Sequence, residues 1–278
     1  MDATEDTNTS KQYSLFHKIL RESKHVAILS GAGLSAESGV PTFRGPGGYW
    51  RRFVATQLAT PEAFKENPSR VWQFYHYRRN GMLTKQPNPA HKALSKYRRL
   101  VDSKQAGETT TFTVITQNVD ELTPRDVDPI EMHGSLFRIR CTACGRREQN
   151  RDNPICEALR GTEDIEKEEA NIPIEKLPSC SGCGGLMRPD VVWFHENLDE
   201  DIMKRISDVL RECDLFLVVG TSAIVYPAAG FAERVKMKGG KVVEFNIEAT
   251  MDEEDVDMRF VGPCGQTLPK ALRVDGME

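Results

Sequence analysis

Four of the seven cysteines stand in two Cys-x2-Cys pairs, a spacing that is typical of zinc sites. Cys141 and Cys144 form the first pair, and Cys180 and Cys183 form the second. Each pair can place two thiolates on one tight turn, so two turns supply the four ligands of a tetrahedral Zn²⁺. Because four protein ligands leave no open position, we expect this zinc to stabilise the fold and to take no part in catalysis. Buried free thiols are the alternative interpretation.

A glycine-containing turn follows the first apolar run of the chain. The run His25–Ser30 is short and predicts a buried parallel strand, and Gly31 and Gly33 come directly after it. Glycines at this place let the backbone approach a pyrophosphate closely. The third glycine of the usual dinucleotide pattern is replaced by Ala36, so the turn by itself is a weak indication of a nucleotide site. Residues 41–48 are rich in glycine and proline and predict a loop that covers the ligand.

Three more apolar runs end directly in polar residues. Phe112–Thr116 precedes Gln117, Asn118, Val119 and Asp120; Leu215–Val219 precedes Gly220, Thr221 and Ser222; Lys241–Phe245 precedes Asn246, Ile247 and Glu248. Helical patterns separate these runs, as at Asp201–Arg211 and Pro227–Lys238. This alternation predicts an α/β fold with a doubly wound, parallel, Rossmann-like sheet. Such sheets bind ligands at the carboxyl ends of their strands.

His133 is the candidate general base. It follows the polar strand end at Asp120 closely in the sequence. The ordinary imidazole pKa of about 6.5 suits proton abstraction at neutral pH. A structural histidine is the more common finding for a single residue of this type, and the neighbouring polar strand end favours a catalytic role.

The 278 residues suffice for one large core and a small accessory module. We expect a disordered tail at residues 1–12, a Rossmann-like nucleotide-binding domain from 13–50, 91–137 and 190–278, a helical segment at 51–90 and a zinc-binding module at 138–189. A first helix should cover Tyr13–Ser23, and Ser69 is the expected N-cap of a helix inside the helical segment. The acidic run Glu163–Glu169 is interpreted as a solvated loop.

The composition excludes several classes of function. A formal net charge of −4 argues against general nucleic-acid binding, which needs a basic field. No apolar run reaches the roughly 20 residues needed to cross a membrane. Because no transit peptide is visible and the cysteine pattern favours metal over disulfides, we expect a reducing intracellular compartment. The cytoplasm or nucleus is favoured over the mitochondrion, and the expected oligomeric state is a monomer.

The motifs GAGLSAESGVPTFRG, TQNVDEL, HGSL, the four cysteines, GTS, FNIE and GPCGQTLP follow one another along the chain from about Ser23 to Leu272. In these motifs and in their order the chain resembles the sirtuins, a family of NAD-dependent protein lysine deacylases. The chain is most similar to class III deacylases, which remove succinyl, malonyl and glutaryl groups from lysine. Ala59, Tyr75 and Arg78 carry this finer likeness.

The resemblance implies a role for each matching residue. The residues implied for the NAD phosphates, the ribose and the nicotinamide lid are Gly31, Ala32, Gly33, Ser35, Ala36, Pro41, Phe43 and Arg44. Those implied for the nicotinamide ribose and amide are Gln117, Asn118, Val119 and Asp120, and those for the adenosine half are Gly220, Thr221, Ser222, Asn246, Ile247, Glu248 and Cys264. Tyr75 and Arg78 would bind the acyl carboxylate beside Ala59. Val192, Trp193 and Phe194 would pair with the acyl-lysine peptide as an edge strand, close to Tyr226.

The resemblance also implies that NAD is a consumed co-substrate. The acyl oxygen of the substrate would attack the ribose carbon that carries nicotinamide, with His133 as base through the ribose hydroxyls and Asn118 and Asp120 assisting. The products would be nicotinamide, free lysine and 2′-O-acyl-ADP-ribose. Two other functions stay open: an NAD- or ADP-ribose-binding protein whose zinc module docks a partner, and an ADP-ribosyltransferase.

Two segments depart from the sirtuin pattern. The connection Thr123–Pro129 is shorter than usual, and His195 replaces a glycine. If that glycine position has positive φ, His195 must adopt a backbone conformation that side chains disfavour.

Overall fold

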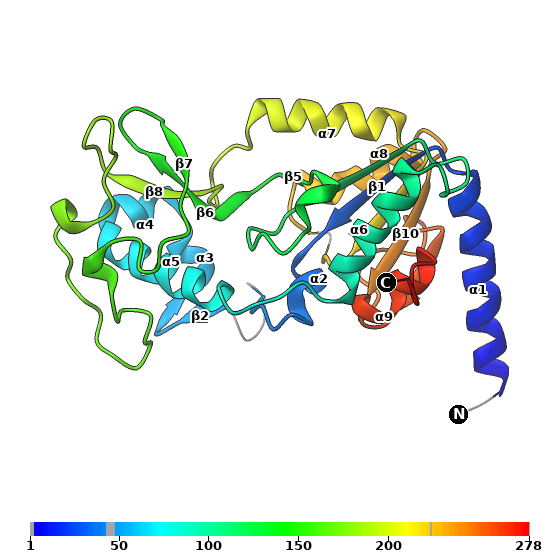
Figure 1. Ribbon diagram of the computed structural model, residues 1–278, viewed down its shortest axis with the longest axis horizontal. Helices are drawn as coiled ribbons and strands as arrows, with labels where there is room; N and C mark the ends of the chain where they lie inside the picture. Colours follow the sequence, from blue (N-terminus) through cyan, green and yellow to red (C-terminus); the bar gives the residue numbers. More distant parts are fainter. Residues whose placement is uncertain (1–2, 43–47, 223, 278) are drawn as a thin grey trace.

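A parallel sheet forms the larger lobe of the protein in the computed structural model, which describes residues 3–42, 48–222 and 224–277 (Figure 1). Among these residues the sheet has six strands in the order β11-β10-β9-β1-β4-β5. They are β1 (His25–Ser30), β4 (Thr111–Thr116), β5 (Ile130–Glu131), β9 (Leu215–Val219), β10 (Lys241–Asn246) and β11 (Met258–Val261). Every neighbouring pair is parallel, so the predicted fold class is confirmed. The strand order reverses beside β1, where such sheets bind ligands.

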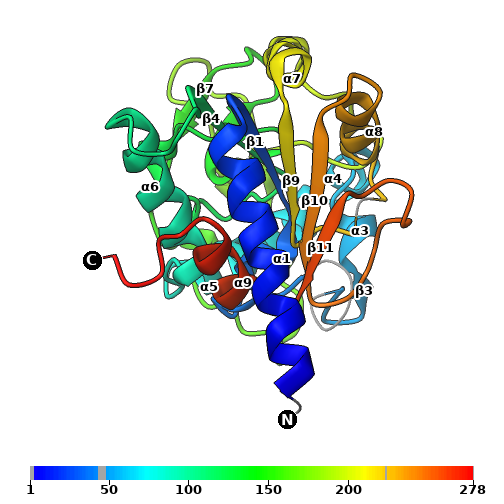
Figure 2. The same cartoon turned by 90° about the vertical axis from the view of Figure 1, so that its right-hand side faces the viewer.

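Helices cover both faces of this sheet. One face carries α1 (Ala3–Glu22), α6 (Pro89–Asp102) and α9 (Cys264–Ala271), and Figure 2 shows α1 crossing the strands. The other face carries α7 (Glu200–Glu212) and α8 (Phe231–Lys236). With both faces covered, all five residues of β9 are buried. This two-sided burial explains why the central strands are continuous apolar runs in the sequence.

The first helix corrects one prediction. It begins at Ala3, so residues 3–12 are helical and the prediction of a disordered tail at 1–12 is wrong for them. The Gln12 side chain donates a hydrogen bond to the Arg259 carbonyl (2.6 Å), and the ring of Tyr13 packs 4.6 Å from that of Phe260. These contacts with β11 anchor the helix. A polar N-terminal helix of this kind depends on tertiary packing, and its local sequence does not reveal it.

A second, smaller lobe contains a three-stranded antiparallel sheet in the order β7-β6-β8 (Figure 1). Its strands are β6 (Gly134–Cys141), β7 (Arg147–Gln149) and β8 (Met187–Val191), and the helices α3 (Ala55–Leu58), α4 (Pro61–Glu66) and α5 (Pro68–Met82) pack against them. Trp72 of α5 donates its indole N–H to the Met187 carbonyl (2.9 Å). The segments predicted as a helical segment and a zinc-binding module therefore share one hydrophobic core.

Short elements complete the chain. They are α2 (Ala32–Ala36), β2 (Tyr49–Trp50), β3 (Phe53–Val54) and the 3₁₀ turns η1 (Arg125–Val127), η2 (Glu157–Leu159), η3 (Ile174–Lys176) and η4 (Ala228–Gly230). No helix within the described ranges has both the length and the apolar character that a membrane span requires.

The N-cap prediction for α5 is wrong by two positions. Asn67 caps the helix by accepting the amide of Arg70 at 2.9 Å, and Pro68 is the first helical residue. Ser69 instead donates its hydroxyl to the carbonyl of Ala170 (3.0 Å). Proline fits the first position of a helix because that position needs no amide donor, and this favours a cap at Asn67.

Candidate active site

A cleft of about 960 Å³ lies between the two lobes, at the carboxyl ends of β1, β4, β9 and β10. The predicted site residues that line it are Gly31, Ala32, Gly33, Pro41, Ala59, Tyr75, Arg78, Gln117, Asn118, Val119, Asp120, His133, Val192, Trp193, Phe194, Gly220, Thr221, Ser222, Tyr226, Asn246, Ile247 and Glu248. The tertiary structure therefore gathers five separate sequence motifs, GAGLSAESGVPTFRG, TQNVDEL, HGSL, GTS and FNIE, around one cavity. Phe43 and Arg44 lie outside the described residues.

The turns after β1 and β9 press against each other at the floor of the cleft. The amide of Gly33 donates to the carbonyl of Gly220 at 2.7 Å. A Cβ atom at Gly33 would lie 2.7 Å from the Gly220 Cα, and Gly220 itself has φ +59° with no room for a side chain. Both positions require glycine for this close approach. The turns therefore present bare backbone to the cleft, as a pyrophosphate site requires.

Ser35, Ala36 and Cys264 were predicted to contact the cofactor, but they do not line the cleft formed by the described residues. Ser35 is buried behind it, and its hydroxyl accepts the side-chain amide of Asn118 (3.1 Å). The Cys264 thiol is buried and turned toward the carbonyl of Phe245 (3.9 Å). Ser35 and Cys264 therefore support the cavity wall from behind, whereas Ala36 is exposed.

His91 supports Ser35 and was not singled out by the sequence analysis. Its Nδ1 accepts the amide of Asn88 (3.3 Å), so the proton resides on Nε2 and is donated to the Ser35 hydroxyl (3.3 Å). Burial lowers the pKa of His91 to about 4, so this tautomer is neutral at physiological pH. The capping box formed by Asn88 and His91 is the local signal that could have revealed it.

His133 lines the cleft with a defined tautomer. Its Nδ1 lies 3.0 Å from the backbone carbonyl of Gln117, and a carbonyl can only accept, so Nδ1 carries the proton. The lone pair on Nε2 is left for a proton from a ligand. Burial lowers the pKa of His133, although the bond to Gln117 acts in the opposite direction. The neutral, base-competent form is therefore favoured at neutral pH.

Three polar residues that follow β4 line the cleft. Gln117 donates its side-chain amide to Thr221 Oγ1 (3.0 Å), which ties the end of β4 to the end of β9. Asn118 donates to the carbonyl of Gly31 (3.0 Å). Burial raises the pKa of Asp120, while the amide of Leu122 and the hydroxyl of Ser35 lower it in part.

The smaller lobe contributes Ala59, Tyr75 and Arg78 to the lining of the cleft. Tyr75 and Arg78 stand one helical turn apart on α5 and are both buried, at 1% and 9% exposure. Burial raises the pKa of Tyr75 to about 12, even though the positive charge of Arg78 opposes this. A protonated phenol and a guanidinium are thus both buried beside a cavity, which suits recognition of a carboxylate.

The segment after β8 runs along the cleft without forming the predicted strand. β8 ends at Val191, and the amides of Val192 and Phe194 donate to the carbonyls of His133 and Ala59, both at 2.9 Å. Trp193 points into the core, whereas Phe194 is 41% exposed. His195 has φ +70°, the left-handed conformation considered for this glycine replacement. Its exposed ring lies 3.4 Å from Glu62.

The four predicted zinc ligands come together at the edge of the smaller lobe. Their sulfur atoms all lie within 4.8 Å of one another, with Cys141 to Cys183 at 3.5 Å and Cys144 to Cys180 at 3.8 Å. Zn–S bonds of about 2.3 Å in a tetrahedron require sulfur separations of about 3.8 Å. The amides of Cys144 and Ala143 lower the pKa of the Cys141 thiol to about 6, which favours the thiolate. The set therefore fits zinc, and all seven cysteines are free of disulfide bonds.

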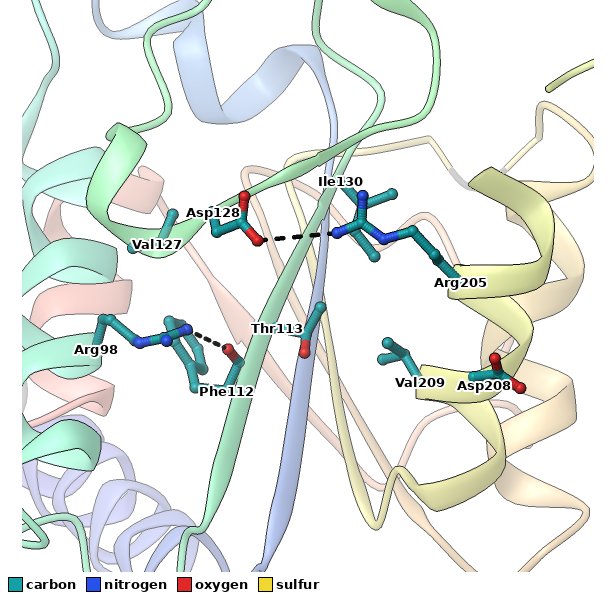
Figure 3. Close-up of a pocket in the computed structure, with 9 residues that line it drawn as sticks. All are labelled: Arg98, Phe112, Thr113, Val127, Asp128, Ile130, Arg205, Asp208 and Val209. Carbon is teal, nitrogen blue, oxygen red and sulfur yellow. Dashed lines mark hydrogen bonds and ion pairs between the residues drawn. The ribbon is translucent and has the colours of Figure 1, made fainter. Parts of the chain in front are cut away.

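A second hollow, of about 290 Å³, lies beside β4 between α6 and α7 (Figure 3). Arg98 and Arg205 face it from opposite sides. Arg205 is paired with Asp128 (3.8 Å), and Arg98 donates to the carbonyl of Phe112 (3.3 Å). Because these cations already have partners within the protein, the hollow lacks the convergent polar groups of the larger cleft.

The family of this chain follows from its similarity to known proteins. The model of the Sir2 family matches residues 31–227. This chain belongs to the Sir2 family. The sirtuin is 53% identical over 263 residues to the "NAD-dependent protein deacylase sirtuin-5, mitochondrial" of Canis lupus familiaris, covering 92% of this chain and 84% of that protein.

Solved sirtuin structures agree with this fold. A structure described as a Sir2 homologue–NAD complex is 36% identical, with a TM-score of 0.77 and coverage of 94% of this chain and 92% of that one. A Sir2–p53 peptide–NAD⁺ complex is 27% identical, with a TM-score of 0.74 and coverage of 95% and 98%. The predicted family and fold are confirmed.

The sequence analysis also missed some residues that line the cleft in this sirtuin. Thr56 comes from α3, Met203 from α7 and Thr250 from the loop after β10. Thr250 lies only two residues beyond the FNIE motif, and its hydroxyl donates to the carbonyl of Thr221 (3.1 Å). That proximity is a usable signal, whereas nothing in the local sequence marks Thr56 or Met203.

Proposed function

We propose that this sirtuin uses NAD to remove acyl groups from protein lysines and prefers acyl groups that end in a carboxylate. Succinyl, malonyl and glutaryl groups are the substrate class. The observation that carries the preference is the pair Tyr75 and Arg78, which are buried one helical turn apart and line the cleft. The name of the dog relative supports the deacylase activity.

The residues of the cleft fit NAD as the co-substrate. The bare backbone at Gly31, Gly33 and Gly220 suits the pyrophosphate, and Asn246 and Glu248 line the cavity next to it for the adenosine half. When bound, NAD supplies an activated ribose carbon that accepts the acyl oxygen as nicotinamide leaves. Covalent use of the co-substrate removes the need for a protein nucleophile.

His133 is the general base in this proposal. Its Nδ1–H is held by the Gln117 carbonyl, and its unprotonated Nε2 accepts the proton of a ribose hydroxyl. Asn118 and Asp120 orient the ligand beside it. Asn118 is held by Gly31 and Ser35, and Asp120 is fixed through the amide of Leu122 (2.9 Å). These bonds keep the polar groups in place before the ligand arrives.

The acyl pocket selects its substrate by charge. A guanidinium can grip a carboxylate through two charge-assisted hydrogen bonds, and a tyrosine hydroxyl can donate a third. Ala59 also lines the cleft, is buried and occupies little volume, which leaves room for the longer acyl chain. An acetyl group offers no carboxylate to either Tyr75 or Arg78.

One experiment separates this function from its alternatives. The protein is incubated with NAD and matched acetyl-, succinyl- and glutaryl-lysine peptides, and the products are followed by mass spectrometry. Formation of acyl-ADP-ribose with free lysine, fastest for the acidic acyl groups, is the expected result. ADP-ribosylated protein in place of acyl-ADP-ribose would identify a transferase. NAD binding without turnover of any peptide would identify a binding protein.

The compartment and assembly state belong to the same proposal. The dog relative carries "mitochondrial" in its name, which favours the mitochondrion over the cytoplasm or nucleus expected from the sequence. Microscopy of the full chain fused at its C-terminus to a fluorescent protein tests this. Monomeric behaviour stays a prediction, which light scattering during gel filtration would check. The expected absence of general nucleic-acid and membrane binding also stays a prediction.

A further inference from the structure

Trp193 contacts the acyl pocket in a way that peptide pairing does not explain. Its indole Nε1 lies 2.8 Å from the hydroxyl oxygen of Tyr75, and both side chains are buried. An indole N–H can only donate, so Tyr75 must be the acceptor. The tyrosine hydroxyl therefore keeps its own proton for a different partner.

We propose that Trp193 is a specificity-determining positioning residue, which orients the Tyr75 hydroxyl as a donor toward an acidic acyl group. The hydroxyl proton of a tyrosine prefers to lie in the plane of the ring, where it can point to either side of the C–O bond. Because the Trp193 N–H binds the Tyr75 oxygen from one side, the hydroxyl proton of Tyr75 points to the other side. This inference rests on the proposed acyl preference, and it assigns the direction of one hydrogen bond within that pocket.

An ion pair between the buried Arg188 and the half-buried Glu196 holds Trp193 in position. Glu196 accepts the backbone amide of Trp193 at 2.8 Å and also binds the Arg188 guanidinium at 2.5 and 2.9 Å. The guanidinium carbon of Arg188 lies 3.4 Å from the centre of the indole ring. The same guanidinium donates to the carbonyl of Val191 (2.9 Å). Backbone and ring are thus fixed together, so the indole N–H has little freedom to turn away from Tyr75.

An aromatic neighbour also restricts the indole ring of Trp193. Phe64 of α4 packs against Trp193 with ring centres 5.2 Å apart. The indole is therefore enclosed by Arg188 and by two aromatic rings, Phe64 and Tyr75. A residue that served only to fill this space would need no N–H group, so the hydrogen bond to Tyr75 is the feature to test.

The test replaces the N–H without changing the shape of the ring. β-(3-Benzothienyl)alanine at position 193 carries sulfur in place of the indole N–H, and Trp193→Phe is the genetically encoded counterpart. For each variant, kcat/KM is measured with a succinyl-lysine and an acetyl-lysine peptide of one sequence. We expect the succinyl-to-acetyl ratio to fall about tenfold, the scale of a hydrogen bond to a charged group. The loss should be in the KM of the succinyl peptide.

A double-mutant cycle distinguishes orientation from packing. In a Tyr75→Phe background the hydroxyl is absent, so replacing Trp193 should change the ratio no further. Trp72→Phe is the matched control, because Trp72 is buried as well and donates its indole N–H, but to the Met187 carbonyl. That control should melt at a lower temperature and keep the wild-type ratio.

Two results would overturn the inference. One is an unchanged succinyl-to-acetyl ratio in the isosteric Trp193 variant. The other is an equal fall of the ratio whether Trp193 is replaced in the wild-type or in the Tyr75→Phe background, which would assign Trp193 a packing role only. If the wild-type protein shows no preference for succinyl-lysine, the proposed acyl selectivity fails before any variant is made, and the two failures are thus distinguishable.

Discussion

Replacing Arg78 by methionine tests the acyl preference most directly. Methionine keeps much of the apolar stem and removes the charge and all hydrogen-bond donors. Arg78 is 9% exposed, and burial lowers the pKa of its guanidinium, so little water competes for it. The substitution therefore removes a desolvated cation from the lining of the cleft while Tyr75 and Ala59 stay in place.

The expected magnitude follows from the bonds that would be lost. Two charge-assisted hydrogen bonds to a carboxylate contribute about 1.5–2 kcal/mol each, or about 3–4 kcal/mol together. At about 1.4 kcal/mol per factor of ten, the succinyl-to-acetyl ratio of kcat/KM should fall roughly 10²- to 10³-fold in Arg78→Met. Desuccinylation should account for most of this fall.

The assay uses one peptide sequence carrying either succinyl- or acetyl-lysine, with NAD saturating and the released peptide quantified. Arg79→Lys is the matched control, since Arg79 is the adjacent buried arginine and donates to the backbone carbonyls of Leu136, Asn150 and Asp152. That variant should lose stability and keep the ratio. Equal rates on both peptides in the wild type, or an equal loss on both in Arg78→Met, would refute the reasoning about the pocket.

Three further predictions concern the base, the metal and the pH dependence of folding. His133→Tyr should retain NAD or ADP-ribose binding in calorimetry while turnover falls roughly 10²- to 10⁴-fold, and normal turnover would reassign the base. Cys141→Ser should lower the melting temperature and solubility together with activity, because binding to a four-cysteine site is coupled to folding; a fully active, metal-free protein after chelation would contradict a structural zinc. The folded pKa of His91, about 4, lies below the ordinary value of 6.5, so the folded state binds fewer protons than the unfolded state between these values. The neutral imidazole thus contributes stability above about pH 6.5 that is lost as the pH falls toward 4, on the order of 3 kcal/mol. Urea unfolding at pH 7 and pH 4.5 should show a smaller difference for His91→Gln, and an identical difference would show that His91 does not titrate on unfolding.

The sequence by itself determined the metal ligands and the four central strands of the sheet, whereas the edge strands β5 and β11 were not predicted. Strands that are buried on both faces must be apolar throughout, so β1, β4, β9 and β10 could be located within about one residue. The polar residues after each strand then identified the carboxyl edge as the ligand site. The cysteine pairs could also be recognised from the sequence, because each tight turn is formed by only four consecutive residues.

Only the tertiary structure decided which of these residues face the ligand. Ser35 and Cys264 belong to matching motifs, but they are buried behind the cleft wall. The N-terminal part of α1 depends on Gln12 and Tyr13 contacting β11, more than 240 residues away in sequence. The spacing of residues along the chain reveals only the periodicity of helices and strands. The burial of Ser35 and Cys264 and the start of α1 depend on contacts between segments that are distant in the sequence.

In the acyl pocket, too, one feature was predicted from the sequence and another depends on the tertiary structure. The spacing of Tyr75 and Arg78 on one helix predicted that both could point the same way. The direction of the Tyr75 hydroxyl depends on Trp193, 118 residues further along the chain and fixed by Arg188 and Glu196. A hydrogen bond between buried groups has a definite donor and acceptor only once their positions are known, and the fold alone supplies those positions.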